Sequence, residues 1–311
     1  MDISPAQDCW YLTGATAVGK TGVALALAER LGAEVLSLDS MAVYRGMDIG
    51  TAKPGRDLQS RLPHHLINLV APDEEFSVAR YLDLAMQTIG EIRSRDRTPL
   101  FVGGTPLYLK CLLRGLFEGP PADWDLRSEI ESELATVGSP ALHERLALVD
   151  PLAANQIHPN DSRRIVRALE VYRVTGQPIS HQQEEFEEGR PAEACRVFVL
   201  QRPREEQHGR IEARVEEMIA EGLVDEVRAL TADGNELGRT ASQAVGYQEV
   251  IEHLAGDSDL PTTIERIKTR TRRFAKRQGA WFRGLSECRF VDLEPEEAPE
   301  TIAGRIVEAG E

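Results

Sequence analysis

The stretch "YLTGATAVGKTGVALALAERLG", Tyr11 to Gly32, decides which fold we expect. An apolar stub leads into a glycine-spaced octet, and a run rich in alanine and leucine follows it. The octet, GATAVGKT at residues 14–21, fits the pattern G-x-x-x-x-G-K-[ST] and lies between a predicted strand and a predicted helix, as the pattern requires. It therefore indicates a phosphate-binding loop.

The residue types of this octet suit a diphosphate. Its glycines let backbone amides approach phosphate oxygens, and the helix that follows presents its positive end. Lys20 would neutralise phosphate charge, and the Thr21 hydroxyl would hold Mg²⁺, the one cofactor that we expect. The predicted diphosphate ligands of the octet are Gly14, Ala15, Thr16, Ala17, Val18, Gly19, Lys20 and Thr21.

Strand and helix patterns alternate outward from the octet. Strands are predicted near Trp10 and at EVLSL, LINLV (residues 66–70) and PLFVG, and helices are predicted from Gly19, from Ser77 and after Thr105. This alternation predicts a parallel sheet flanked by helices, an α/β core of the P-loop NTPase type.

A change of pattern divides the chain. Between about Gly115 and Arg190 the strand signal disappears, and helical segments run up to the acidic tract EEFEEGRP. The runs CRVFVLQR and CRFVDL then resume the strand pattern. We predict a catalytic core at residues 1–114 and 191–311, with basic helices toward its C-terminal end, and a helical insertion at 115–190.

Composition limits the possible partners and location. The 311 residues include 36 basic and 51 acidic ones, a formal charge of −15, so that any nucleic-acid surface must be a local one. The four cysteines form no CxxC pair, which favours a reducing compartment without structural zinc. Without a secretory signal pattern or an apolar run near ~18 residues, we expect a cytoplasmic protein that uses no membrane.

One candidate catalytic group directly follows the second predicted strand, and two more lie on a later predicted helix. Asp39 directly follows EVLSL, where the carboxyl end of a parallel strand faces the ligand crevice, so it is a candidate general base. The alternative is an aspartate that caps the next turn. Arg210 and Arg214 lie one helical turn apart and are candidates to stabilise a leaving group, or else a surface pair matched by glutamates.

Two basic tracts are candidates for contact with nucleic acid. Eight basic residues and no acidic one lie between Arg266 and Arg283, which predicts a helix facing phosphates, with a solvated helix face as the alternative. The tract RRIVR, residues 163–167, also fits an amphipathic helix that buries its apolar side. Trp281 is a base-stacking or a core residue, and His64 and His65 are interpreted as structural.

Several motifs together resemble one family. In order they are the octet, DSMAVYRGMDIGTAKP, VGGTPLYLKCLLRGL, IHPNDSRRIVRALEVYRVTG, AVGYQE and KRQGAWFRG. From about Tyr11 to Arg283 the chain resembles the bacterial form of the tRNA dimethylallyltransferases. The octet departs from the commoner GPTASGKT at its second and fifth positions, where it has alanine and valine.

The resemblance implies an activity. A dimethylallyl group would pass from dimethylallyl diphosphate to N6 of the adenosine 3′-adjacent to the anticodon, in tRNAs that read codons beginning with U, and diphosphate would be released. Asp39 would accept the N6 proton, and Thr105 would lie beside the reacting centre. The protein would act as a monomer on the anticodon stem-loop.

The resemblance also implies a set of tRNA-binding residues, spread over both predicted parts of the chain. They are Asp39, Ser40, Met41, Ala42, Thr105, Arg127, Arg163, Arg164, Ile165, Val166, Arg167, Gln243, Gly246, Tyr247, Gln248, Lys276, Arg277, Gln278, Trp281 and Arg283.

Three other functions stay open at this point. A P-loop small-molecule kinase would use Asp39 as the base for a hydroxyl group, and a relative that prenylates free adenine nucleotides would use the same loop. Neither needs the basic helix. A nucleotide-dependent RNA-binding module would need the helix but not Asp39 and Thr105.

Overall fold

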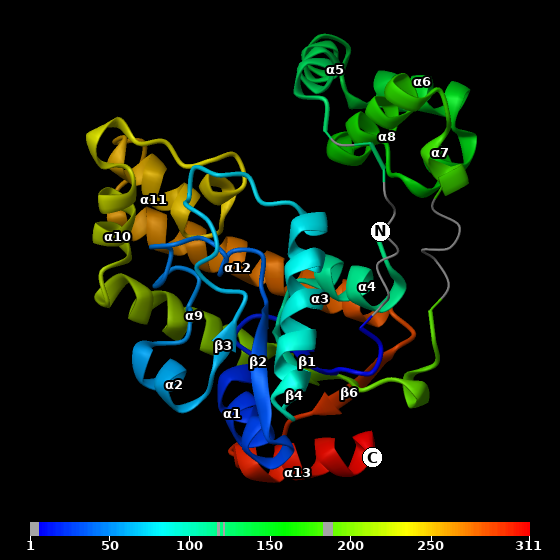
Figure 1. Cartoon of the computed structure of the whole chain (residues 1–311). Helices are drawn as coiled ribbons and strands as arrows, with labels where there is room; N and C mark the ends of the chain where they lie inside the picture. The colour runs from blue at the N-terminus through cyan, green and yellow to red at the C-terminus, as the bar shows by residue number, and fades with distance from the viewer. Residues whose placement is uncertain (1–5, 117–118, 121, 183–188) are drawn as a thin grey trace. The chain divides into compact units, whose positions relative to one another are not determined.

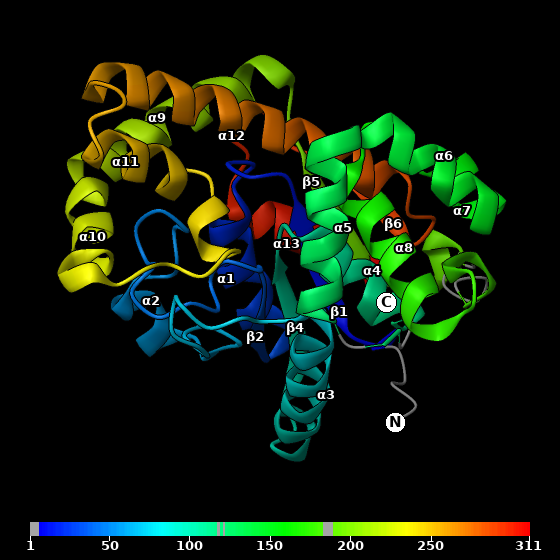
Figure 2. The same cartoon turned by 90° about the horizontal axis from the view of Figure 1, so that it is seen from above.

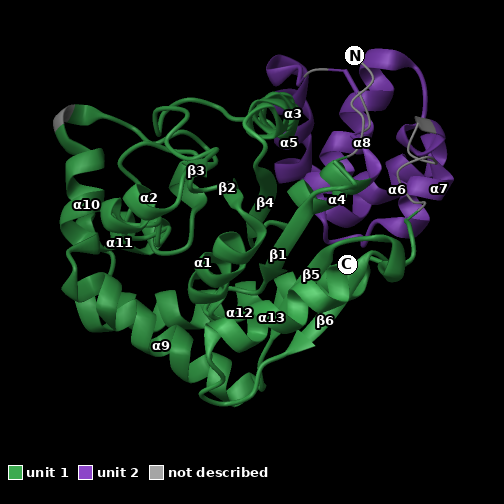
Figure 3. Ribbon diagram, turned by 60° about the horizontal axis from the view of Figure 1, so that its bottom comes forward, with its two compact units in different colours: residues 1–113, 189–311 green, residues 114–188 purple. Residues whose placement is uncertain are grey.

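The computed structural model describes residues 6–116, 119–120, 122–182 and 189–311, and the chain divides into two compact units (Figure 3). Unit 1 comprises residues 1–113 and 189–311, and unit 2 comprises residues 114–188. Most of the acidic tract EEFEEGRP lies outside the described residues.

The framework of unit 1 is a six-stranded sheet in which every pairing is parallel (Figure 1). The strand order is β3-β2-β4-β1-β5-β6. The strands are β1 (Trp10–Gly14), β2 (Ala33–Leu38), β3 (His64–His65), β4 (Thr98–Gly103), β5 (Val197–Gln201) and β6 (Cys288–Asp292). Every residue of β1 and β2 is buried, as parallel strands covered on both faces require.

The prediction of a strand at LINLV is wrong. The structure has a strand only at the two preceding histidines, because Leu66 and Asn68 adopt positive φ angles of 61° and 55°, which end the extended backbone. His64 and His65 pair with Val35 and Leu36 of β2. Nε2 of His65 donates a hydrogen bond to the carboxylate of buried Glu34 at 2.7 Å, which fits the structural interpretation of this pair.

Helices cover both faces of the sheet. On one face α1 (Lys20–Leu31) and α13 (Pro299–Gly310) share an apolar cluster with β1 and β5. On the other face lie α3 (Val78–Ser94) and α4 (Pro106–Arg114), where Tyr81 stacks on Tyr108 with ring centroids 4.0 Å apart. Helix α1 begins after Gly19 at φ 105° and ends at left-handed Gly32, so that glycines bound it at both ends.

A second apolar cluster in unit 1 joins the long segment after β2 to the helices after β5. It holds Tyr44 and Met47 against Val215, Tyr247 and Ile267. The helices are α9 (Arg204–Ala220), α10 (Leu223–Leu230), α11 (Tyr247–Leu254) and α12 (Leu260–Arg283), and the segment after β2 contains α2 (Arg56–Arg61). Helix α12 lies alongside α9 (Figure 2).

Unit 2 is a helical bundle with a core of its own. Its helices are α5 (Trp124–Val137), α6 (Ser139–Val149), α7 (Pro151–Gln156) and α8 (Ser162–Thr175). Asp123, Asp150 and Asp161 cap α5, α7 and α8 by accepting hydrogen bonds from backbone amides of the first turn. Ile130 and Leu146 are fully buried at its centre. Across both units, the described helices include none that is both long enough and apolar enough to span a bilayer.

Candidate active site

The glycine-spaced octet forms the turn between β1 and α1. Gly14 has φ 141°, and a Cβ atom there would lie 2.6 Å from the carbonyl oxygen of Leu200 in β5, so that no larger residue fits. Gly19 at φ 105° lets the chain enter α1, and Ala17 at the crest of the loop is left-handed at φ 60°. The octet therefore has the turn geometry that its pattern predicts.

Lys20 lies beneath the loop. Its Nζ donates hydrogen bonds to the carbonyl oxygens of Gly14 at 2.8 Å and Ala15 at 3.0 Å. The pKa of the Lys20 ammonium is lowered from its ordinary 10.5 to about 7, mainly by burial and also by the charge of Arg214, while the charge of Asp39 opposes the change. The group is thus held where an anion would favour its charged form.

Side chains from α9 and its approach hold the crest of the loop from outside. Arg202 donates to the carbonyl of Val18 at 3.0 Å, Gln207 to that of Thr16 at 3.0 Å, and Arg210 to that of Ala17 at 2.9 Å. The guanidinium groups of both arginines lie beside Gly19. The sequence predicts Arg210 as a residue of the diphosphate site, but it does not predict Arg202 or Gln207. Arg202 directly follows β5, so its position at a strand end was the available signal.

Asp39 lies at the carboxyl end of β2, as predicted. Its Oδ1 accepts hydrogen bonds from the backbone amides of Met41 at 2.8 Å and Ala42 at 3.4 Å, so the aspartate does stabilise the following turn. Among the described residues Oδ2 has no hydrogen-bond partner. One oxygen fixes the carboxylate, and the other is available to a ligand.

Thr105 connects the end of β4 to the same place. Its amide donates to the carbonyl of Leu38 at 3.1 Å, and its Oγ1 accepts from the amide of Ser40 at 3.1 Å. The Thr105 hydroxyl therefore contacts Ser40, the residue after Asp39 in the chain, and helps to hold the loop that contains Asp39. The structure brings both candidate catalytic residues together from two neighbouring strands.

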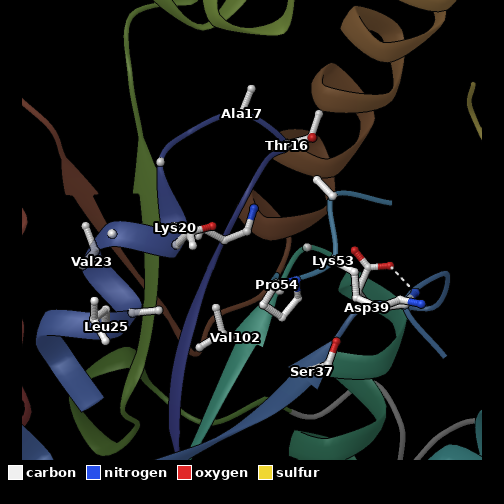
Figure 4. A pocket seen from close by; sticks show the side chains of 18 of the residues that line it. Thr16, Ala17, Lys20, Val23, Leu25, Ser37, Asp39, Lys53, Pro54 and Val102 are labelled. Carbon is white, nitrogen blue, oxygen red and sulfur yellow. Dashed lines mark hydrogen bonds between the residues drawn. The ribbon is translucent and has the colours of Figure 1, made fainter. Parts of the chain in front are cut away.

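Lys20 and Asp39 line one pocket of about 680 Å³ (Figure 4), together with Gly104, the residue before Thr105. Lys20 and Asp39 reach toward the same space, with Val102 and Pro54 close by. Thr21, Arg210 and Arg214 also line the pocket. Arg214 is deeply placed, and burial lowers its pKa from the ordinary value. Cations thus surround the loop side of the pocket, and a carboxylate faces them.

Comparison with known proteins identifies the family of this chain. The family model described as IPP transferase matches residues 42–285. The chain belongs to the IPP transferase family. A tRNA dimethylallyltransferase of Rhodopirellula baltica is 51% identical over 303 residues, which are 94% of this chain and 91% of that protein. The resemblance noted in the sequence is thereby confirmed.

Solved structures of IPP transferases share the fold. The crystal structure of a tRNA isopentenylpyrophosphate transferase from Bacillus halodurans has a TM-score of 0.70 at 39% identity, covering 98% of this chain and 97% of that one. A eukaryotic dimethylallyltransferase captured acting on tRNA has a TM-score of 0.74 at 29% identity, covering 91% and 73%. The predicted α/β fold of the P-loop type is confirmed.

The basic residues of α12 fall into two groups. Toward its N-terminal end, ion pairs join Arg266 to Glu252, Lys268 to Glu216 and Glu265, Arg270 to Glu249, and Arg272 to Glu212. Toward its C-terminal end, four exposed cations form no ion pair with any described residue. We call these four the α12 cation group: Arg273, Lys276, Arg277 and Arg283.

These ion pairs narrow the prediction that the whole tract from Arg266 to Arg283 faces phosphates. The helix carries no acidic residue between Arg266 and Arg283, but acidic residues of α9 and α11 pair with its first half. Of the eight basic residues in this tract, the four of the α12 cation group are the ones without an ion pair to a described residue. Trp281 is 37% exposed beside this group, whereas Phe282 is fully buried.

The arginines predicted from unit 2 have structural partners. Glu170 is fully buried and accepts hydrogen bonds from Arg127 at 2.7 Å, from Arg167 at 2.9 Å and from the amide of Asp123 at 2.9 Å. Burial alone would raise the pKa of Glu170, but these bonds outweigh it and hold that pKa below the usual value. Arg127 also lies over the ring of Trp124.

Some predicted tRNA residues are interior. The side chains of Ile165, Val166 and Ala42 are buried, and so is Tyr247, whose hydroxyl donates to Glu226. Gln278 is buried too, with its amide bonded to backbone groups of Thr16 and Gly104, so that it is not placed to contact tRNA directly. Gly246 is buried as well, and it begins α11 at φ 95°. Ser40, Met41, Gln243 and Gln248 are partly exposed, and Arg163 and Arg164 are exposed. Their tRNA contacts stay predictions.

Proposed function

We propose that this chain transfers the dimethylallyl group of dimethylallyl diphosphate to N6 of the adenosine on the 3′ side of a tRNA anticodon. The observation that carries the proposal is the common pocket of Lys20 and Asp39. A cationic loop at one side suits a diphosphate, and a carboxylate with one oxygen unengaged suits a proton acceptor. The relatives named tRNA dimethylallyltransferases support the choice of tRNA.

The reaction then runs as follows. The N6 lone pair forms a bond to C1 of the allylic group while the C1–O bond breaks, and its electron pair leaves with the diphosphate. The loop amides, Lys20 and Arg210 stabilise the charge that develops on the leaving oxygen, a kind of stabilisation typically worth several kcal/mol. Asp39 takes the proton that N6 loses, which adds ~10²- to 10⁴-fold as general-base catalysis.

Mg²⁺ fits the residues at the loop. Thr21 is exposed at the start of α1, with its hydroxyl beside the phosphate-binding turn. The described residues contain no group of three or more His, Cys, Asp or Glu side chains that would hold a metal by itself. A divalent ion would therefore be held jointly by Thr21, the diphosphate and water, and it would neutralise charge on the leaving group.

The target base must leave its stack before C1 can reach N6, which costs a few kcal/mol. The α12 cation group would hold the phosphates of the anticodon stem-loop. The same proposal includes a preference for tRNAs that read codons beginning with U, a monomeric enzyme and a cytoplasmic location, and the names of the relatives support only its choice of tRNA.

Separate pairings of substrates test this function. Labelled dimethylallyl diphosphate is incubated with tRNA or with adenosine monophosphate, and labelled ATP is incubated with tRNA. Label should enter tRNA only from dimethylallyl diphosphate. Label in adenosine monophosphate would favour the free-nucleotide reaction, and stoichiometric consumption of ATP would favour a kinase.

A further inference from the structure

The side-chain amide of Gln278 connects α12 to two loops of the candidate active site. Gln278 lies in the C-terminal half of α12 and is only 4% exposed. Its Nε2 donates to the carbonyl of Gly104 at 2.6 Å, and its Oε1 accepts from the amide of Thr16 at 2.9 Å. Both ends of one buried amide are therefore satisfied by backbone groups of the site.

The two loops are those that carry the proposed chemistry. Thr16 belongs to the crest of the phosphate-binding turn, and Gly104 directly precedes Thr105. A Cβ atom at Gly104 would lie 2.6 Å from Nε2 of Gln278 and 3.2 Å from the carbonyl oxygen of Gly14. The close approach of the amide therefore requires glycine at position 104. Through Thr105 and Ser40 the same contact reaches the Asp39 loop.

The exposed face of α12 near Gln278 is where the proposed function places the RNA. Lys276 and Arg277 of the α12 cation group immediately precede Gln278 and are exposed, while the amide points inward. Exposed cations and buried amide thus share one turn of a continuous helix. A helix moves as a rigid element, so a change at its exposed face is carried to the amide on its buried face.

We propose that Gln278 is a positioning residue that couples RNA bound at the α12 cation group to the geometry of the diphosphate loop and the Thr105 loop. This inference rests on the proposed function. Bound RNA would fix the C-terminal half of α12, and Gln278 would then hold both loops in the reactive arrangement. Such couplings between sites typically change affinity by about 5- to 150-fold.

Gln207 supplies a matched comparison. It holds the same residue, Thr16, but through the carbonyl oxygen and from α9, which carries none of the α12 cation group. Loss of the Gln207 contact should loosen the loop without disconnecting it from α12. The substitution of glutamine by methionine, close in size and without hydrogen-bonding groups, can be made at both positions.

The test begins with wild-type protein and labelled dimethylallyl diphosphate, because product formation on tRNA establishes the proposed function independently. Calorimetry then measures the affinity for inorganic diphosphate with Mg²⁺, with and without an anticodon stem-loop. In the wild type the RNA should raise this affinity by about 5- to 150-fold. In Gln278→Met the RNA effect should fall to within twofold of none, while the affinity for RNA changes by less than threefold.

In Gln207→Met the affinity for diphosphate should fall equally with and without RNA, so the RNA effect persists. The coupling is refuted if RNA leaves the wild-type affinity unchanged, or if Gln278→Met retains the full RNA effect. If wild-type protein prenylates no tRNA at all, the proposed function fails instead, and the two failures are therefore distinguishable.

A second variant separates positioning from folding. Gln278→Glu keeps an acceptor for the Thr16 amide, but its carboxylate has no proton to donate to Gly104. The variant's kcat, taken as a fraction of the wild-type kcat, should recover as pH falls from 8 to 5.5 and the new carboxyl is protonated. The same fraction for Gln278→Met should not depend on pH. A flat profile for Gln278→Glu would refute the role of the Gly104 bond.

Discussion

The pKa of Lys20 gives the sharpest prediction. Its folded value of about 7 lies well below the ordinary 10.5 of an unfolded chain. Each pKa unit corresponds to about 1.4 kcal/mol, so holding the ammonium charged in the folded, unliganded loop costs up to about 5 kcal/mol. This free energy is an upper bound because Lys20 lines the pocket and is partly exposed, so that solvent there reduces the cost of its charge.

The sign follows from proton linkage. A lysine with a lowered folded pKa binds more protons when unfolded, so its cost is complete below pH 7 and is relieved as pH rises toward 10.5. Between pH 7 and pH 9 the wild type should gain about 2 kcal/mol of unfolding free energy relative to Lys20→Met. Comparing the two proteins across pH cancels the loss of the hydrogen bonds from Lys20 to Gly14 and Ala15, which Lys20→Met lacks at every pH.

Two measurements check this. The chain has five lysines, so ¹³Cε resonances of labelled lysine are few enough to follow by NMR, and Lys20→Met assigns the relevant one. That resonance should titrate near pH 7 and shift its midpoint upward when diphosphate is added. Urea unfolding at both pH values gives the free-energy difference. A Lys20 resonance that titrates above pH 9 without ligand would refute the reasoning.

Three further outcomes are expected. Asp39→Asn keeps an acceptor for the turn and should leave tRNA affinity within threefold while kcat falls at least ~10²-fold; a loss below tenfold in single-turnover assays argues against Asp39 as the base. Lys276→Ala and Arg277→Ala should each flatten the salt dependence of tRNA binding by about 0.7–0.9 in log–log slope, whereas Arg272→Ala, already paired with Glu212, should not. Glu170→Ala should destabilise unit 2 by about 3–5 kcal/mol in urea unfolding, because two arginines lose their buried partner. As the folded pKa of Glu170 is lowered, the stabilisation that it provides should be present above about pH 4.5 and be lost as pH falls through the folded value.

The sequence predicted local features of unit 1 better than contacts between distant segments. The octet, the start of a helix at Ser77 and Asp39 at a strand end depend on spacing of a few residues. The strand prediction at LINLV was wrong because it rested on composition, which suits a strand, whereas Leu66 and Asn68 adopt left-handed backbone angles that composition does not indicate.

Contacts across the chain escaped prediction for a different reason. Arg202 and Gln207 meet the octet only because β5 lies beside β1, a neighbour relation that spans more than 180 residues. The pairing of Arg272 with Glu212 likewise depends on two helices lying together. A charge count along α12 could not reveal that its first half is already neutralised.

The ion pairs in the first half of α12 affect how strongly this helix attracts different nucleic acids. Attraction to any nucleic acid grows with the number of unpaired cations, whatever its sequence or shape. Within α12, ion pairs already occupy Arg266, Lys268, Arg270 and Arg272, so that the proposed RNA contact of this helix depends on the α12 cation group, and the nonspecific attraction that α12 adds to a chain of charge −15 is reduced. Under the proposed function, modified tRNA held through these four cations can also dissociate quickly, because few phosphate contacts must break. A small number of unpaired cations would then favour rapid turnover.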